Sequence, residues 1–153
     1  MIQRIQTLYL LVAELLIGAL FIKPFAKLVD KGGVEYTTDL LGVHKLGANS
    51  LILQPNTLLS ILGGSVLLLI LLTIFNYKNR KNQQKLAFIG LVGCFVTDGL
   101  MFLHVRSVSE QLAGIYTLTL TFIFPIIAAV LIFMAIKGIR KDEALVRSID
   151  RIR

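Results

Sequence analysis

Apolar residues gather into four long runs along the chain, and polar segments separate these runs. The runs lie at about residues 5–22, 57–76, 86–105 and 110–136. A helix that crosses the hydrocarbon core of a membrane needs about 20 consecutive, mostly apolar residues, and each run is close to that length or longer. The pattern predicts an all-α membrane protein, in which a four-transmembrane-helix bundle makes up a single integral membrane domain, residues 1–153.

The composition agrees with this prediction. The chain has 153 residues, 56% of them hydrophobic, and its mean hydropathy is +0.78. A secretory signal peptide is the alternative for the first run, because Arg4 precedes an apolar stretch. That run exceeds the apolar core of a typical signal peptide, about 7–15 residues, and Lys23-Pro24 follows it in place of an Ala-x-Ala cleavage site. We therefore expect an uncleaved helix.

Residues 23–56 form the longest connection, the predicted outer loop, in which acidic and basic side chains nearly balance. Loops of this length usually have structure of their own. Gly32 and Gly33 indicate a turn, and the residues that follow, VEYTT at 34–38, alternate in polarity and favour strands. We predict two or three short β-strands on the outer ends of the helices. The alternative is an irregular loop whose leucines dip into the headgroup region.

Helix-capping residues suggest where the later helices begin. Asn56 and Thr57 are good N-caps for the second helix. Ser107 followed by Glu110 fits a capping box, which predicts that the fourth helix begins at about residues 107–110. Pro125 cannot donate a backbone hydrogen bond, so we expect a kink there within the fourth helix.

A short basic loop separates the second and third runs. Residues 76–85 read NYKNRKNQQK and contain no acidic side chain. Because Lys and Arg are retained on the cytoplasmic side, this loop predicts the topology. Eleven of the 16 Lys and Arg residues then lie in inner segments and five in outer loops. Both termini are expected in the cytoplasm.

The C-terminal tail, residues 137–153, predicts a cytoplasmic helical extension of the fourth span. Leu145, Ile149 and Ile152 recur at helical spacing on one face. A bend at Gly138 would lay this face on the membrane. A straight helix would project and need a partner to cover it, and a third possibility is a solvated end that only fixes orientation. The residues expected to contact anionic lipid or a protein partner are Lys78, Arg80, Lys81, Lys85, Arg140, Lys141, Leu145, Arg147, Ile149 and Ile152.

Two acids, Glu14 and Asp98, interrupt apolar runs. Counted from the inner ends of their helices they lie roughly 14 and 18 Å deep, near the middle of a core about 30 Å thick. Ser65 and Thr121 reach a similar depth from the outer side. The predicted intramembrane polar cluster is therefore Glu14, Ser65, Asp98 and Thr121. It is either a proton or cation site, or one or two neutral acids that hydrogen-bond between helices, and we favour the second interpretation.

Other functional signatures are missing from the sequence. Cys94 is the single cysteine, and His44 and His104 are the only histidines, so no metal-ligand spacing is present. No nucleophile motif or phosphate-binding loop is found. The formal charge of +7 fits contact with anionic lipid better than nucleic-acid binding, for which no fold signature exists. We expect no enzyme, no cofactor and no metal.

The termini carry a resemblance to a known family. The start MIQRIQTLYLL and the end IKGIRKDEALVRSIDRIR resemble an uncharacterised family of small four-helix inner-membrane proteins of Bacteroidetes, over the whole chain. The resemblance implies a bacterial inner (cytoplasmic) membrane location and assigns no functional residue. The order of one helix, a strand-bearing outer loop and three further helices is also similar to the architecture of the claudin and peripheral-myelin class.

Two functions fit these observations. The first is a non-enzymatic accessory or scaffolding subunit of a larger membrane assembly, which contacts anionic lipids and a protein partner. The second is a small transporter or proton-coupled channel that uses Glu14 and Asp98. A polar path to both acids would favour transport, and a closed apolar bundle would favour the subunit.

Overall fold

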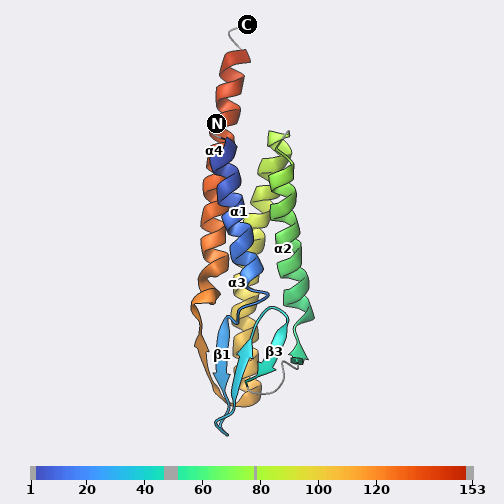
Figure 1. Cartoon of the computed structure of the whole chain (residues 1–153), viewed down its shortest axis with the longest axis vertical. Helices are drawn as coiled ribbons and strands as arrows, with labels where there is room; N and C mark the ends of the chain where they lie inside the picture. The colour runs from blue at the N-terminus through green and yellow to red at the C-terminus, as the bar shows by residue number, and fades with distance from the viewer. Residues whose placement is uncertain (1–2, 47–51, 78, 151–153) are drawn as a thin grey trace.

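Four helices lie side by side, and one small sheet covers one end of them (Figure 1). The computed structural model describes residues 3–46, 52–77 and 79–150. The helices are α1 (Gln3–Ala19), α2 (Thr57–Phe75), α3 (Arg80–Leu112) and α4 (Phe124–Asp150). The prediction of a mostly helical protein with strands in the outer loop is confirmed at this level.

The helices pack in a closed ring of neighbours. Both α1 and α3 pack against α4 on one side and against α2 on the other, so α1 and α3 are diagonally opposed. Their shared interior is apolar and includes Leu10, Ile70, Cys94, Met101 and Ile132, each at most 1% exposed. Close packing of these side chains holds the four helices together.

The sheet is antiparallel and draws on two separate parts of the chain. Its strands are β1 (Ala26–Val29), β2 (Glu35–Thr38), β3 (Gly42–Lys45), β4 (Ile52–Pro55) and β5 (Ile115–Leu118), in the order β4-β3-β2-β1-β5. The outer loop thus supplies four strands, where two or three were expected. The fifth comes from the connection between α3 and α4.

Three helical segments are long and apolar enough to cross a membrane: Thr57–Phe75, Arg80–Leu112 and Leu120–Ala144. The first helix was expected to continue to residue 22, but α1 ends at Ala19. Its 17 residues span about 26 Å, less than the hydrocarbon thickness of about 30 Å. Tight turns continue the apolar segment as far as Lys23, whose N–H donates to the Ala19 carbonyl at 2.8 Å. At the other end of the loop, Asn56 caps α2 as predicted and accepts from the Leu59 N–H at 3.3 Å.

The predicted boundary between the third and fourth helices is wrong. Residues 107–112, expected to begin the fourth helix, still belong to α3, because Val108 packs against Leu28 and Val43 of the sheet. The long α3 therefore serves as a support for the sheet. It ends where Ala113 takes a left-handed conformation, φ 47°, and Ser109 Oγ donates to the Gly114 carbonyl at 2.8 Å.

The kink predicted at Pro125 is also wrong. A 3₁₀ turn, η1 (Leu120–Ile123), precedes α4, and Pro125 lies in the first turn of that helix. A proline is tolerated there because the first N–H groups of a helix have no intrahelical partner.

Of the two alternatives for the tail, a bend at Gly138 or a straight projecting helix, the structure has the second. The helix α4 continues without interruption to Asp150, and its C-terminal end projects beyond the other helices (Figure 1). Gly138 instead permits close packing on α1, since a Cβ at this position would lie 2.8 Å from Gln6 Cγ.

Candidate functional site

Glu14 lies on the side of α1 that faces α2. Thr7 of α1 shares a cavity with Tyr77, and Phe21 lies against Gly63 of α2. Residues seven apart on a helix share one face. From Thr7, and from Phe21 in the turn that follows α1, we infer that Glu14 faces α2 at about the level of Ile70. Glu14 Oε2 is buried and has no hydrogen-bond partner among the described residues.

Asp98 lies on the side of α3 that faces α4. It shares this face with Gln84, whose Nε2 donates to Glu143 Oε2 of α4 at 2.7 Å. Asp98 follows Gln84 by 14 residues on α3, and Ala129 precedes Glu143 by 14 residues on the antiparallel α4. Asp98 is therefore about level with Ala129. Asp98 Oδ1 is buried and, in the part of the chain that the structure describes, finds no hydrogen-bond partner.

Neither Glu14 Oε2 nor Asp98 Oδ1 has a hydrogen-bond partner among the described residues, and from the positions of their helices we infer that the two acids do not form the predicted cluster. They lie on diagonal helices and face opposite seams, α1–α2 and α3–α4, with the apolar interior between them. Their levels also differ. Ile70 faces Gly90, where a Cβ would lie 3.8 Å from Ile70 Cγ1, and Asp98 is about eight residues farther along α3, roughly 12 Å.

Ser65 and Thr121 do not join either acid. Ser65 is exposed, lines an outer groove between α2 and α3, and donates to the Leu62 carbonyl of its own helix at 2.7 Å. Thr121 Oγ1 donates to the Pro24 carbonyl and ties η1 to the segment before β1. Counted from the ends of their helices, the four residues lie at a similar depth. They lie on helix faces that meet different neighbours, however.

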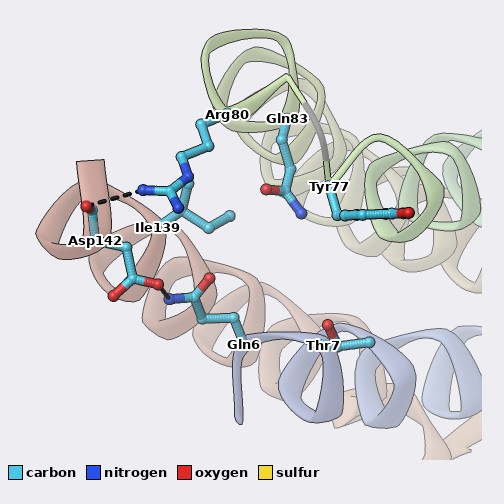
Figure 2. A pocket seen from close by; sticks show the side chains of 7 residues that line it. All are labelled: Gln6, Thr7, Tyr77, Arg80, Gln83, Ile139 and Asp142. Atoms are coloured by element: carbon cyan, nitrogen blue, oxygen red, sulfur yellow. Dashed lines mark hydrogen bonds between the residues drawn. The ribbon is translucent and has the colours of Figure 1, made fainter. Parts of the chain in front are cut away.

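A polar layer at the end of the bundle opposite the sheet was not predicted (Figure 2). Gln6 Nε2 donates to Asp142 Oδ2 at 2.7 Å, and Arg80 donates through a guanidinium N–H to the Asp142 backbone carbonyl at 2.9 Å. Gln83 Nε2 donates to the Thr73 carbonyl at 3.1 Å. We call Gln6, Arg80, Gln83 and Asp142 the polar layer. It joins α1, α3 and α4, and Gln83 also ties α3 to α2.

The polar layer borders a cavity of about 20 Å³, lined by Gln6, Thr7, Tyr77, Arg80, Gln83, Ile139 and Asp142. A space of this size has room for about one water molecule. Gln6, Gln83 and Asp142 are buried, at most 9% exposed, and buried polar groups require partners. The sequence did offer a signal for this layer, because Gln6 and Gln83 lie at the inner ends of two apolar runs. Isolated amides at such positions need partners from neighbouring helices.

The basic residues expected at a lipid or partner surface lie at this same end. Lys81, Lys85, Arg140 and Lys141 are exposed, whereas Arg80 belongs to the polar layer. Leu145, Arg147 and Ile149 belong to α4, but their side chains, like the whole of Lys78 and Ile152, lie outside the described residues. Contact of this surface with lipid or a partner stays a prediction.

Two further observations limit the chemistry of the described residues. No group of three or more His, Cys, Asp or Glu side chains among them is placed to hold a metal ion. His44 Nε2 lies 3.0 Å from Asp39 Oδ2, and this pair joins β3 to the turn that precedes it.

Fold and site define a mostly helical protein with three helices long and apolar enough to cross a membrane, an antiparallel sheet at one end and a polar layer at the other. Residues 2–152 match the family described as Domain of unknown function (DUF4293). The chain belongs to this family. No curated protein matches the sequence.

Proposed function

We propose that this protein is a non-enzymatic integral membrane protein of the bacterial inner membrane that serves as an accessory or scaffolding subunit of a larger assembly. The outward faces of all four helices support a membrane location. They carry large exposed apolar side chains, such as Leu15, Leu68, Phe88 and Phe133, which water would disfavour and hydrocarbon accepts.

The positions of the charges support a topology with both termini in the cytoplasm. The start of α1, the turn between α2 and α3, and the end of α4 lie together at the end opposite the sheet (Figure 1). That end carries the basic loop and tail, which the positive-inside rule places in the cytoplasm. In this orientation α1 is the fourth span, extended by the turns up to Lys23, and the sheet lies outside.

The observation that favours a subunit over a transporter is the closed apolar interior between Glu14 and Asp98. A proton or ion path normally runs through polar side chains or water-filled cavities at the bundle centre. Here the buried residues of the interior are mostly apolar, among them Ile70, Cys94 and Met101. The buried Thr97 hydroxyl donates to the Gly93 carbonyl of its own helix at 2.8 Å, so it offers no link between the two acids. Glu14 and Asp98 face different helix–helix interfaces, so a proton cannot pass directly from one carboxyl group to the other.

Each acid nevertheless keeps one buried oxygen without a partner among the described residues. A polar atom without a hydrogen bond is costly in an apolar environment. A transmembrane helix of another protein could contact the half-buried Glu14 side chain, because the interface between α1 and α2 packs more sparsely than the other interfaces of the bundle. A subunit role therefore gives Glu14 a partner without a path through the bundle.

The test is to purify the full chain from native membranes in a mild detergent and to measure its mass by native mass spectrometry. We expect a complex with another membrane protein rather than the 17.0 kDa chain alone. Glu14→Leu should weaken the complex, and Glu14→Gln, which still donates and accepts, should preserve it. A chain that is monomeric in native nanodiscs would contradict the proposal.

The alternative function, a small transporter or proton-coupled channel, draws its support from the same unpaired oxygens. Reconstituted liposomes can measure proton flux with the wild type and with Asp98→Asn and Glu14→Gln. We expect no flux above that of empty liposomes. A flux that either substitution abolishes, with folding intact, would favour the transporter.

A further inference from the structure

Strand β5 forms an open edge of the sheet. It pairs with β1 alone, in the register Lys27 with Thr117 and Leu28 with Tyr116. The residue that precedes the strand packs tightly against β1. Gly114, just before the strand, approaches β1 so closely that a Cβ would lie 2.2 Å from the Val29 carbonyl oxygen.

The hydrogen-bonding direction of each β5 residue follows from its register. The Thr119 N–H donates to the Phe25 carbonyl at 2.9 Å, and in an antiparallel pair the residues alternate between facing the partner strand and facing away. Thr117 and Ile115 therefore direct their backbone groups toward β1. Tyr116 and Leu118 direct an N–H and a carbonyl each toward the open edge.

This edge lacks the features that usually prevent strand addition, such as charged side chains, proline or a bulge. All four residues of β5 (IYTL) are exposed and uncharged. Ile115 is 79% exposed, and Leu120 just beyond the strand is 74% exposed. The opposite edge strand, β4, ends at Pro55 and has an irregular register against β3, so it is protected where β5 is not.

A second copy of the chain does not fit this edge. The strands run roughly along the length of the bundle (Figure 1), so two copies inserted in the same direction can bring their β5 strands together only in parallel. Parallel pairing is less stable per residue, and β5 has four residues. Antiparallel pairing would need one copy to be inverted in the membrane. Because two copies could pair their β5 strands only in this weaker way, we take the occupant to be a segment of a different protein.

We propose that the open edge of β5 binds an extended segment of a partner protein outside the membrane, which adds to the sheet as an antiparallel strand. This inference rests on the proposed function and identifies how the subunit contacts its partner. The backbone groups of Tyr116 and Leu118 supply the hydrogen bonds. The side chains of these two residues share the face of buried Ala26 and Leu28, so the partner segment carries apolar residues on that face and tolerates polar ones on the other.

The closing experiment compares Leu118→Pro with Leu118→Val in the full chain. Proline at residue 118 removes an N–H that faces the open edge and leaves the N–H groups of the β1 ladder intact, and valine keeps the strand preference and the N–H. A photoreactive p-benzoylphenylalanine replaces Tyr116 in both, and the cells are illuminated. We expect cross-linking to one partner protein in the Leu118→Val chain and about a tenfold loss in the Leu118→Pro chain. The same probe in place of Tyr36 on β2 should give no such adduct.

An adduct of twice the mass of the chain, a lipid adduct alone, or a protein adduct that survives Leu118→Pro would overturn the inference. Amide hydrogen exchange of the wild type gives an answer even if Leu118→Pro does not fold. The Tyr116 and Leu118 amides should be protected in native nanodiscs and exchange in detergent, and free exchange in both would overturn the inference. A partner that co-purifies equally well with Leu118→Pro would leave the subunit role standing while strand addition fails. A chain without any partner would refute both.

Discussion

Gln6 near the start of the chain donates a side-chain hydrogen bond of 2.7 Å to Asp142 near its end. This bond joins α1 to α4 where Gly138 lets Gln6 pack closely on α4. Asp142 is also held through its backbone carbonyl by Arg80 of α3. The bundle is therefore closed at this end by a hydrogen-bonded layer, and the projecting part of α4 begins directly beyond it.

The first prediction concerns this bond. Asp142→Ala leaves the buried Gln6 amide without its acceptor, which should destabilise the protein by about 1–3 kcal/mol. Thermal unfolding of the detergent-solubilised chain measures the change. Asp142→Asn, which keeps an acceptor, and Lys141→Ala at an exposed neighbouring position serve as controls. Additive effects of Gln6→Ala and Asp142→Ala in a double-mutant cycle would show that the two residues are not coupled.

The second prediction uses two adjacent glycines of α2. A Cβ at Gly63 would lie 2.7 Å from Leu40 Cδ1 and 3.2 Å from Phe21 Cζ, whereas a Cβ at Gly64 would meet nothing within 4 Å. Gly63→Ala should therefore destabilise the protein by about 1–3 kcal/mol through overpacking. Gly64→Ala should be neutral or stabilising by up to about 1 kcal/mol. Unfolding midpoints of the two variants compare them, and equal midpoints would be inconsistent with this packing of Phe21 and Leu40 on α2.

The sequence predicted the helices and the sheet of the outer loop well, because long apolar runs and strand-forming residues are local signals. The prediction was wrong at residues 107–118, where contacts with the sheet determine the local structure. Ser107 and Glu110 suggested the start of a new helix, but Glu110 forms an ion pair of 3.0 Å with Arg106 on the exposed side of α3, while Val108 packs on the sheet. Gly114 followed by IYTL was a usable strand signal, hidden within an uncharged stretch long enough for one helix.

The polar cluster failed for a different reason. Depth along a helix can be counted from a sequence, whereas the neighbour that a given face meets depends on how the helices are arranged around one another. Glu14 and Asp98 each lie beside the core positions of their helices, and only the ring order of the four helices places them on opposite seams. The polar layer was missed for the same reason, because Gln6 and Asp142 are separated by 136 residues.

The third prediction concerns the junction that fixes β5. Gly114→Ala would bring a Cβ to 2.2 Å from the Val29 carbonyl oxygen, a backbone atom that cannot rotate away. We expect the free energy of unfolding to fall by about 1–3 kcal/mol or more. We also expect faster protease cleavage near residues 113–119. Gly32→Ala is the matched control, since its Cβ would make an ordinary contact of 3.8 Å with Asp30 Oδ2. Protease resistance equal to that of this control would contradict the placement of β5.

The last prediction tests the orientation of the chain in the membrane. Asn82 at the start of α3 and Lys31 in the turn between β1 and β2 are both exposed and lie at opposite ends of the molecule. Cys94 is buried, so it should not react with a thiol reagent that cannot cross the membrane. With the basic loop in the cytoplasm, such a reagent should label Lys31→Cys in cells whose cytoplasmic membrane is intact and accessible to it. Asn82→Cys should be labelled only after that membrane is permeabilised. The reverse pattern would place the sheet in the cytoplasm and would remove the outer partner strand proposed for β5, whereas equal labelling of both positions before permeabilisation would show that the chain does not divide two compartments.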